Sequence, residues 1–421
     1  MENQLYMIAR RVLGNNDKEI YFRSGNKCFV TDVDGNDYID FILAYGPVIL
    51  GHNNSEYLNN MREKISAGFC FPSYSVYHQE YSEDINSFYK TSKTIGFFST
   101  SSESGQAALR ICRHITGKKK FVRLGYLGWH DNLINGGLHW HEPLNSDLRK
   151  KVSTELTYHN NDDYDAINWG DGSLETLQYI IANNREISCL MFDAYQSIHL
   201  GFEKTTAAID LCRKNNILVV MDETKTSGRI SPYGYYERMF DFDFTILGKA
   251  IGNGAATSVL IGKDTFDINY YDLKIGGTYA RDNIGIISAL ITKEIMHKYD
   301  YYNSIKSIGV EVSRVINKVL DKYNIGHLLW VEAMMEGGIL EFRFCDGIAN
   351  QITARRYLEL SLLNNNILVP WGHCFYVCSE HISVYKVLEE RLEMAIKEWI
   401  HQHENLISKA SQEEMIYGGR M

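Results

Sequence analysis

Short apolar runs alternate with amphipathic stretches through the middle of the chain. The runs have the length and β-rich composition of buried strands, and they lie at 95–98, 120–124, 188–192, 217–221 and 244–247. Helical spacing of apolar positions is found at 103–116, 174–182 and 206–215. Strands that alternate with helices predict a mostly parallel sheet covered on both faces. Because ligands of such sheets bind outside the carboxyl ends of the strands, we look for chemistry there.

The two ends of the chain follow another pattern. Strand-like runs at 28–31 and 38–41 flank an Asp-Gly-Asn turn signal and predict a hairpin. Beyond about residue 296, a helix, two strands and a last helix are expected at 302–323, 328–331, 339–344 and 384–399. We therefore predict a second, smaller α+β domain, to which the N-terminal hairpin contributes. The expected boundaries are 1–58 for the N-terminal segment, 59–300 for the large domain and 301–421 for the small α+β domain.

Composition narrows the classes of partner. The formal net charge of −9 argues against a nucleic-acid-binding surface, and the one basic block, at 118–120, is interpreted as a solvated turn. No apolar stretch reaches the length of a membrane span, and the N-terminus lacks the pattern of a signal peptide. The eight cysteines are scattered without a disulfide framework. We expect a cytoplasmic protein with neither nucleic-acid nor membrane partners.

Two strand ends carry charged residues directly beside apolar runs. Asp222 and Glu223 follow the run at 217–221, where a buried acid is costly unless a charged group pairs with it. Lys249 follows the run at 244–247 among small residues. A lysine in a dry, cationic environment loses its proton more easily and can condense with an aldehyde. Alone, an Asp-Glu pair is also common in Mg-binding and nucleotide enzymes, and a Gly-Lys pair is most often a surface turn.

A third strand end opens a helix with hydroxyl groups, in the sequence Ser-Thr-Ser-Ser-Glu-Ser at 99–104. Hydroxyls and free backbone N–H groups at a helix N-terminus form an anion site that the helix dipole favours. The alternative is a plain N-cap without a ligand, which these residues alone fit equally well.

In this order and at these distances, a set of segments resembles the class III (subgroup II) aminotransferases. The chain looks closest to the glutamate-1-semialdehyde 2,1-aminomutase branch. The segments are 32–40, 46–52, Gly-Tyr-Leu-Gly-Trp-His-Asp at 125–131, Asp-Glu-Thr-Lys-Thr at 222–226, Leu-Gly-Lys-Ala-Ile-Gly-Asn-Gly at 247–254 and Gly-Gly-Thr-Tyr at 276–279. The resemblance implies an α/β protein of fold-type I that depends on pyridoxal 5'-phosphate (PLP), with a mostly parallel seven-stranded sheet in its large domain.

The same resemblance implies a role for each site residue. Lys249 would hold PLP as a Schiff base and later move the proton between the substrate Cα and the cofactor C4'. Asp222 would pair with the pyridine nitrogen and keep the ring cationic, so that the ring accepts electrons from a carbanion. Tyr126 would stack on the ring. Ser101 and Ser102 would hold the phosphate.

A homodimer is also implied, because Thr278 resembles the residue that reaches the phosphate of the second subunit. Each active site would then be shared. The chain departs from the family pattern in three segments: Ser101 stands in a glycine position, Leu127 where many relatives have histidine, and Asp193 with Ala194 where a Glu-Pro pair is usual. These changes cluster around the cofactor and favour a shifted substrate or an altered reaction over loss of PLP binding.

The activity implied is transfer of an amino group between an amino donor and an aldehyde or ketone, through a Lys249 aldimine and a pyridoxamine intermediate. The partners would be small-molecule amines and carbonyl compounds. Alternatives on the same scaffold are intramolecular transfer, as in the aminomutase branch, and racemisation or epimerisation. A catalytically degenerate binding protein of the same fold is a further alternative. The presence of both Lys249 and Asp222 argues against it.

Other residues admit two interpretations. Zinc ligands are suggested by two groups, His139, His141 and Glu142, and then His373, Cys374, Cys378 and His381. The first lacks a second pair at zinc-like spacing and the second lies where the family has a Ser-x-x-His element, so we expect loop histidines, core packing and no metal. Lys225 either faces the pocket or lies on the surface. Arg343 either binds a substrate carboxylate or forms a structural ion pair.

Overall fold

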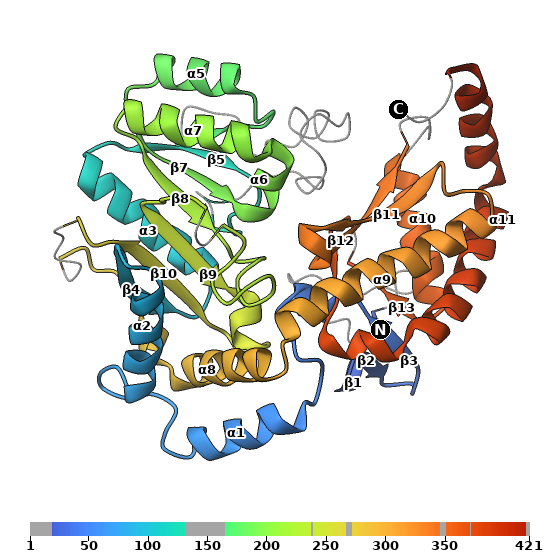
Figure 1. The fold of residues 1–421 in the computed structure, drawn as a ribbon, viewed down its shortest axis with the longest axis horizontal. Coiled ribbons are helices and arrows are strands. Elements are labelled where there is room, and N and C mark those ends of the chain that lie inside the picture. The colour runs from blue at the N-terminus through green and yellow to red at the C-terminus, as the bar shows by residue number, and fades with distance from the viewer. Residues whose placement is uncertain are drawn as a thin grey trace, which may run out of the picture.

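The computed structural model describes residues 19–130, 133, 165–236, 239–266, 272–345, 351–370 and 372–417. Its largest sheet has seven strands in the order β4-β10-β9-β8-β7-β5-β6 (Figure 1). The strands are β4 (Ser92–Phe98), β5 (Lys120–Leu124), β6 (Ala166–Asn168), β7 (Ile187–Asp193), β8 (Leu218–Asp222), β9 (Phe244–Gly248) and β10 (Ser258–Lys263). The five neighbouring strands β6, β5, β7, β8 and β9 are parallel to one another, and β10 is antiparallel to both β9 and β4. The predicted α/β fold with a mostly parallel seven-stranded sheet is confirmed.

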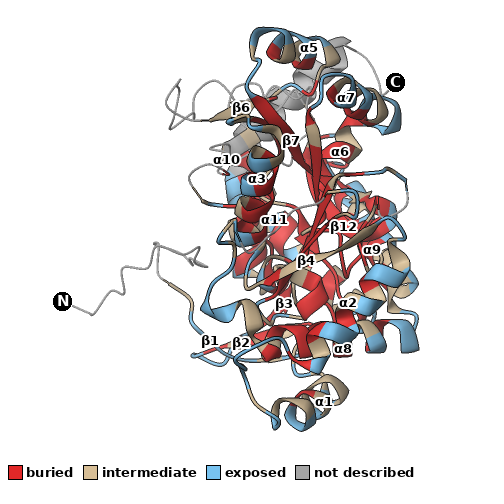
Figure 2. Cartoon of the chain, turned by 90° about the vertical axis from the view of Figure 1, so that its left-hand side faces the viewer, coloured by how far each residue is buried: buried red, intermediate tan, exposed pale blue. Residues whose placement is uncertain are grey.

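Helices cover both faces of this sheet because its strands are apolar on both sides. In β8, Val219 and Met221 pack in one hydrophobic cluster, and Val220 between them packs in another. Most residues of the inner strands from β7 to β10 are buried, whereas the helices around them expose their outer faces (Figure 2). The helices are α1 (Ser55–Ile65), α2 (Val76–Phe88), α3 (Ser101–Thr116), α5 (Leu174–Asn183), α6 (Ala194–Leu200), α7 (Phe202–Lys214) and α8 (Asn283–Lys298).

The second unit joins the two ends of the chain. One sheet has the order β1-β2-β3-β13, and a second the order β11-β12-β14. Their strands are β1 (Phe22–Asn26), β2 (Phe29–Asp32), β3 (Asp37–Asp40), β11 (Leu329–Met334), β12 (Ile339–Phe344), β13 (Ile367–Leu368) and β14 (Phe375–Tyr376). The helices α9 (Tyr301–Lys322), α10 (Gln351–Asn364) and α11 (Tyr385–Tyr417) pack beside them (Figure 1). The parallel pairing of β3 with β13 supports our proposal that the N-terminal segment belongs with the C-terminal domain. Among the described residues, no helix could span a membrane.

A buried arginine connects the two units. Arg229 is fully buried, and its guanidinium donates hydrogen bonds to the carbonyl oxygens of Val377 (2.6 Å) and Gly46 (2.7 Å). Its Cζ also lies 4.9 Å from the centre of the Tyr376 ring. Burial lowers the pKa of Arg229 to about 10, so the group remains charged at neutral pH. One side chain thus ties the loop after β8 to both ends of the chain.

Replacing Arg229 with methionine is expected to lower the free energy of unfolding by about 3 kcal/mol, because two buried carbonyl groups lose a charged donor. Chemical denaturation measures the difference. Arg314→Met is the control, since Arg314 forms an exposed pair with Glu311 three residues away on α9 and should change stability by less than about 0.5 kcal/mol. Equal losses in the two variants would show that Arg229 does not brace the units.

Candidate active site

A cavity of about 340 Å³ lies at the carboxyl ends of the parallel strands, where the alternating pattern predicted a site. Asp193 and Asp222 are the last residues of β7 and β8, and Lys249 directly follows β9. The wall is completed by residues 99–102, 126–128, 224–225 and 254–257, with Ala44 and Pro47 from the N-terminal segment. Both structural units therefore contribute to one cavity.

Lys249 enters the cavity from an unusual backbone conformation. It is the first residue of the 3-10 helix η3 (Lys249–Gly252) and has a φ of +50°, which is uncommon for a residue with a side chain. The preceding Gly248 is held by Ser227, whose hydroxyl accepts a hydrogen bond from the Gly248 N–H at 3.1 Å. Backbone strain of this kind persists only where the surroundings fix it, and it clusters at functional sites.

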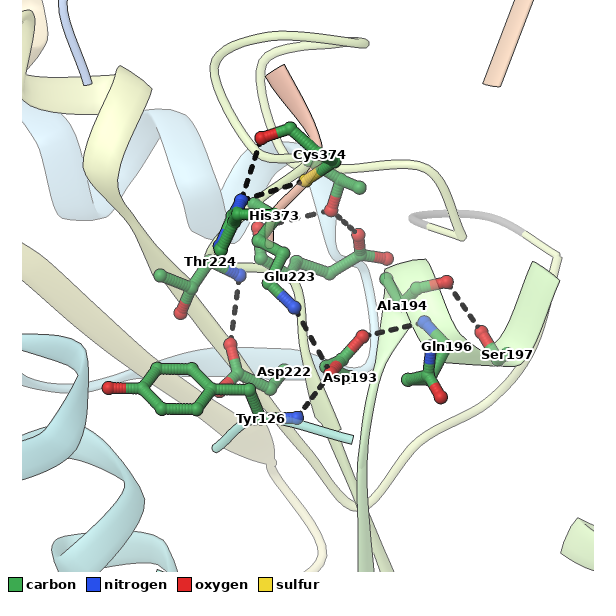
Figure 3. A network of polar contacts seen from close by, with 12 residues as sticks. Tyr126, Asp193, Ala194, Gln196, Ser197, Asp222, Glu223, Thr224, His373 and Cys374 are labelled. Carbon is green, nitrogen blue, oxygen red and sulfur yellow. Dashed lines mark hydrogen bonds and ion pairs between the residues drawn. The ribbon is translucent and has the colours of Figure 1, made fainter. Parts of the chain in front are cut away.

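Asp222 presents a buried carboxylate to the cavity. Only 4% of the residue is exposed, and its Oδ1 accepts a hydrogen bond from the Thr224 N–H at 2.9 Å (Figure 3). Burial raises the pKa of Asp222 to about 6; the neighbouring Asp193 carboxylate acts in the same direction, and the Thr224 hydrogen bond and the Lys225 charge oppose it. A cation in the cavity would stabilise the ionised form of this carboxyl group.

The start of α3, another part of the cavity wall, offers groups that bind an anion. Helix α3 starts with a capping box, in which Thr100 Oγ1 accepts the Glu103 N–H at 3.3 Å and Glu103 Oε2 accepts the Thr100 N–H at 2.8 Å. Ser101 and Ser102 form the first positions of the helix and line the cavity. Their amides are among the first N–H groups of the helix, which have no acceptor within the helix itself. Hydroxyls, amides and the helix dipole together favour a phosphate.

Two glycines make room for these hydroxyls. A Cβ built on Gly248 would lie 2.1 Å from Ser101 Oγ, and one built on Gly128 would lie 2.4 Å from Ser102 Oγ. Ser101 is not among the residues with positive φ, so its position requires no glycine. The departure of Ser101 from the family pattern is thus accommodated by the missing side chain of Gly248. Leu127, another departure, lines the cavity and packs in the core beneath it.

Tyr126 reaches the cavity from the loop after β5. Its side chain lines the wall, and its N–H donates a hydrogen bond of 2.7 Å to Asp193 Oδ2 (Figure 3). Asp193 Oδ2 also accepts a hydrogen bond from Lys225 Nζ at 3.2 Å. Lys225 is 5% exposed, so the interpretation as a surface residue is wrong and the pocket interpretation holds. The pairing of Lys225 with Asp193 could not be read from the sequence, in which the two are 32 positions apart.

The cavity gathers most of the residues singled out from the sequence. Lys249, Asp222, Tyr126, Ser101 and Ser102 all line it, which supports their predicted roles without testing them. Thr278 does not line it and is exposed at the start of the 3-10 helix η4 (Thr278–Arg281). Thr257, also in the wall, was not singled out, because nothing in its surroundings in the sequence sets it apart.

The remaining candidates lie elsewhere. Arg343 forms ion pairs with Glu332 (2.8 Å) and Glu341, which agrees with its interpretation as part of a structural ion pair. His381 is fully buried and stacks on Phe41 with ring centres 4.5 Å apart. Within the part of the chain that the structure describes, no cluster of three or more His, Cys, Asp or Glu residues could hold a metal ion. The candidates His139, His141 and Glu142 fall outside the described residues.

The family model for class-III aminotransferases matches residues 13–334. The chain belongs to the class-III aminotransferases. Its relatives include the 3-aminobutyryl-CoA aminotransferase of Cloacimonas acidaminovorans, 25% identical over 86% of this chain and 85% of that protein. The glutamate-1-semialdehyde 2,1-aminomutase of Archaeoglobus fulgidus is 26% identical over 82% of this chain and 81% of that protein. A β-phenylalanine aminotransferase from Variovorax paradoxus shares the fold, with a TM-score of 0.74, 19% identity and coverage of 96% and 92%.

This class-III aminotransferase is therefore a PLP-dependent enzyme, as the resemblance in the sequence predicted. The residues of the cavity fit the cofactor. The start of α3 offers amides and hydroxyls to the phosphate. The buried Asp222 carboxylate offers a counter-charge to the ring nitrogen, and Lys249 offers an amine to the aldehyde.

Proposed function

We propose that this PLP-dependent aminotransferase acts through Lys249, Asp222 and the start of α3. The observation that carries the proposal is their convergence on one cavity, from three different strand ends. When bound, PLP supplies an electron sink for the charge that develops at the substrate carbon. Asp222 holds the ring nitrogen in its cationic form, and Ser101 with Ser102 anchors the phosphate.

Lys249 would hold the cofactor and, once the substrate amine replaces it, act as the base in the same place. Its Nζ removes the proton from the substrate Cα and returns a proton to the neighbouring reacting atom. Tyr126 forms one wall of the cavity, against which the cofactor ring would stack. The net reaction moves an amino group from a donor to an aldehyde or ketone.

The test is the visible spectrum of the PLP-loaded protein before and after addition of single donors: glutamate, alanine, β-amino acids and amino sugars. One donor is expected to change the cofactor absorption and to yield its keto product, which mass spectrometry detects. Intramolecular transfer, as the aminomutases among the relatives carry out, would give a rearranged amine without a keto product, and an epimerase would give only the stereoisomer. Absence of PLP on Lys249 after borohydride reduction and peptide mapping would overturn the proposal.

We further propose that the enzyme is a homodimer and that Thr278 contributes to the partner's cavity. The segments around Phe69 and Thr278 lie side by side, since Asn283 N–H donates to the Phe69 carbonyl oxygen at 2.8 Å. They expose large apolar side chains, among them Phe69, Tyr74, Val76 and Tyr279. Large apolar side chains exposed on neighbouring segments are typical of an interface between subunits. A cytoplasmic location is supported by the eight cysteines, all of which are free thiols.

A further inference from the structure

We propose that the buried ion pair between Lys225 and Asp193 is a positioning device of the cofactor site, which fixes the Tyr126 wall and leaves Asp222 as the carboxylate that meets the cofactor's cation. The inference rests on the proposed function, because it takes the ring nitrogen of PLP as that cation. It gives a role to two cavity residues, Lys225 and Asp193, that the sequence did not predict to bind the cofactor.

The pair is enclosed and shared by three elements. The exposed fractions of the Lys225 and Asp193 side chains are 4% and 3%, and Nζ lies 3.2 Å from Oδ2. The same Oδ2 accepts the Tyr126 N–H at 2.7 Å, and Oδ1 accepts the Gln196 N–H at 2.6 Å (Figure 3). One carboxylate therefore joins the loop after β5, the start of α6 and the loop after β8.

The chain leaves space for this arrangement at Gly125. Its φ of +84° belongs to the left-handed region that favours glycine, and a Cβ at this position would lie 2.1 Å from Asp193 Oδ2. A side chain there would push the carboxylate away from the Tyr126 amide. The position of the Tyr126 amide thus depends on Asp193, whose carboxylate is paired with Lys225.

The charges at the ends of β7 and β8 explain why Asp222 is the carboxylate left to meet the cofactor's cation. Asp193 and Asp222 are direct partners in the parallel register of β7 and β8. Neighbouring strands lie about 4.8 Å apart, so two ionised carboxylates here would disfavour each other. Lys225 donates its hydrogen bond to Asp193, whereas the Asp222 carboxylate receives the Thr224 N–H. Lys225 thereby neutralises Asp193, and the strand ends retain one negative charge for one incoming cation.

This arrangement predicts shifts of opposite sign in the pH dependence of PLP binding. In Lys225→Met the unpaired Asp193 carboxylate disfavours ionisation of Asp222, so the pH below which PLP affinity falls should rise by about one unit. In Asp193→Asn the Lys225 cation favours ionisation of Asp222, and the same pH should fall. The double variant should return close to wild type, because both charges are gone. Lys225→Arg keeps the cation and should also stay close to wild type.

The measurements are titrations of the apoprotein with PLP from pH 5 to pH 9, followed by visible absorption, and visible circular dichroism of the loaded proteins. Circular dichroism reports how the bound ring is oriented, so Lys225→Met should change its amplitude if the Tyr126 wall moves. Lys318→Met is the control, since Lys318 forms an exposed pair with Glu389. If Lys225→Met fails to fold, the fall in Asp193→Asn and its reversal in the double variant decide the question.

Two outcomes overturn different claims. If the variants lose thermal stability but keep the wild-type pH dependence and circular dichroism, the pair is structural and this inference is wrong. If the wild-type protein itself carries no PLP on Lys249, the proposed function fails first. The wild-type loading measurement therefore separates the two failures.

Discussion

Replacing Lys249 with alanine is expected to abolish turnover while PLP still binds. In the proposed mechanism the lysine has two roles, the attachment of the cofactor and the transfer of the proton, and both would disappear with its amine. Loss of a positioned general base alone lowers the rate by roughly 10²- to 10⁴-fold, and we expect kcat to fall to the upper end of that range or beyond it. Binding survives in part because the start of α3 and Asp222 remain in the cavity.

The assay follows product formation with the donor that the spectral panel identifies. Borohydride reduction and peptide mapping should find PLP on residue 249 of the wild type and not of the variant. Lys214→Ala, an exposed lysine at the end of α7, is the matched control and should keep wild-type kcat. Turnover within tenfold of wild type in Lys249→Ala would contradict the role assigned to this residue.

Replacing Asp222 with asparagine is expected to lower kcat by about 10²- to 10³-fold, the effect of removing one preorganised electrostatic contact. Asparagine retains the acceptor for the Thr224 N–H, so the fold of the loop should persist. It cannot balance a cationic ring nitrogen. The ring would then accept electrons less well, and the loss should appear in kcat more than in KM. Asp210→Asn, an exposed acid on α7, is the control and should leave kcat unchanged.

The same variant has a signature in its pH dependence. Burial raises the pKa of Asp222 to about 6 in the apoprotein, so below pH 6 this group must lose a proton before it can pair with a cation. PLP affinity of the wild type should therefore fall as the pH drops below 6, by up to about tenfold per unit, and this component should vanish in Asp222→Asn. Conversely, above pH 6 the ionised carboxylate opposes folding of the apoprotein, so Asp222→Asn should raise apoprotein stability there. A wild-type affinity that does not change between pH 5 and pH 7 would contradict this assignment.

The sequence predicted the centre of the large sheet better than its edge. The runs at 120–124, 188–192, 217–221 and 244–247 are strands within one residue or two of their expected bounds, because buried parallel strands are apolar throughout. The antiparallel strand β10 and the short β6 were missed. Helix α8 was also missed, since residues on most of its circumference are buried and it lacks the polar face that gives a helical period.

The site was predictable where chemistry follows a strand directly, as at Asp222 and Lys249. It was not predictable where the burial or the position of a residue depends on a partner that is distant in the sequence. Lys225, in the turn after β8, is buried because Asp193 at the end of β7 supplies its counter-charge. Ser101 can replace a glycine because the neighbouring Gly248, which has no side chain, leaves room for its hydroxyl. Such relations depend on which strand ends become neighbours, and the linear pattern does not contain that information.

The pairing of β3 with β13 has a consequence for folding during synthesis. Ile39 pairs with Ile367, so a strand made early waits for one of the last segments to leave the ribosome. The large sheet needs no residue from beyond β10 to complete its order, and domains generally form as units during translation. The N-terminal segment, however, supplies Ala44 and Pro47 to the cavity wall. We therefore expect a nascent chain to form the large sheet first and to complete the cavity wall only after β13 has been synthesised.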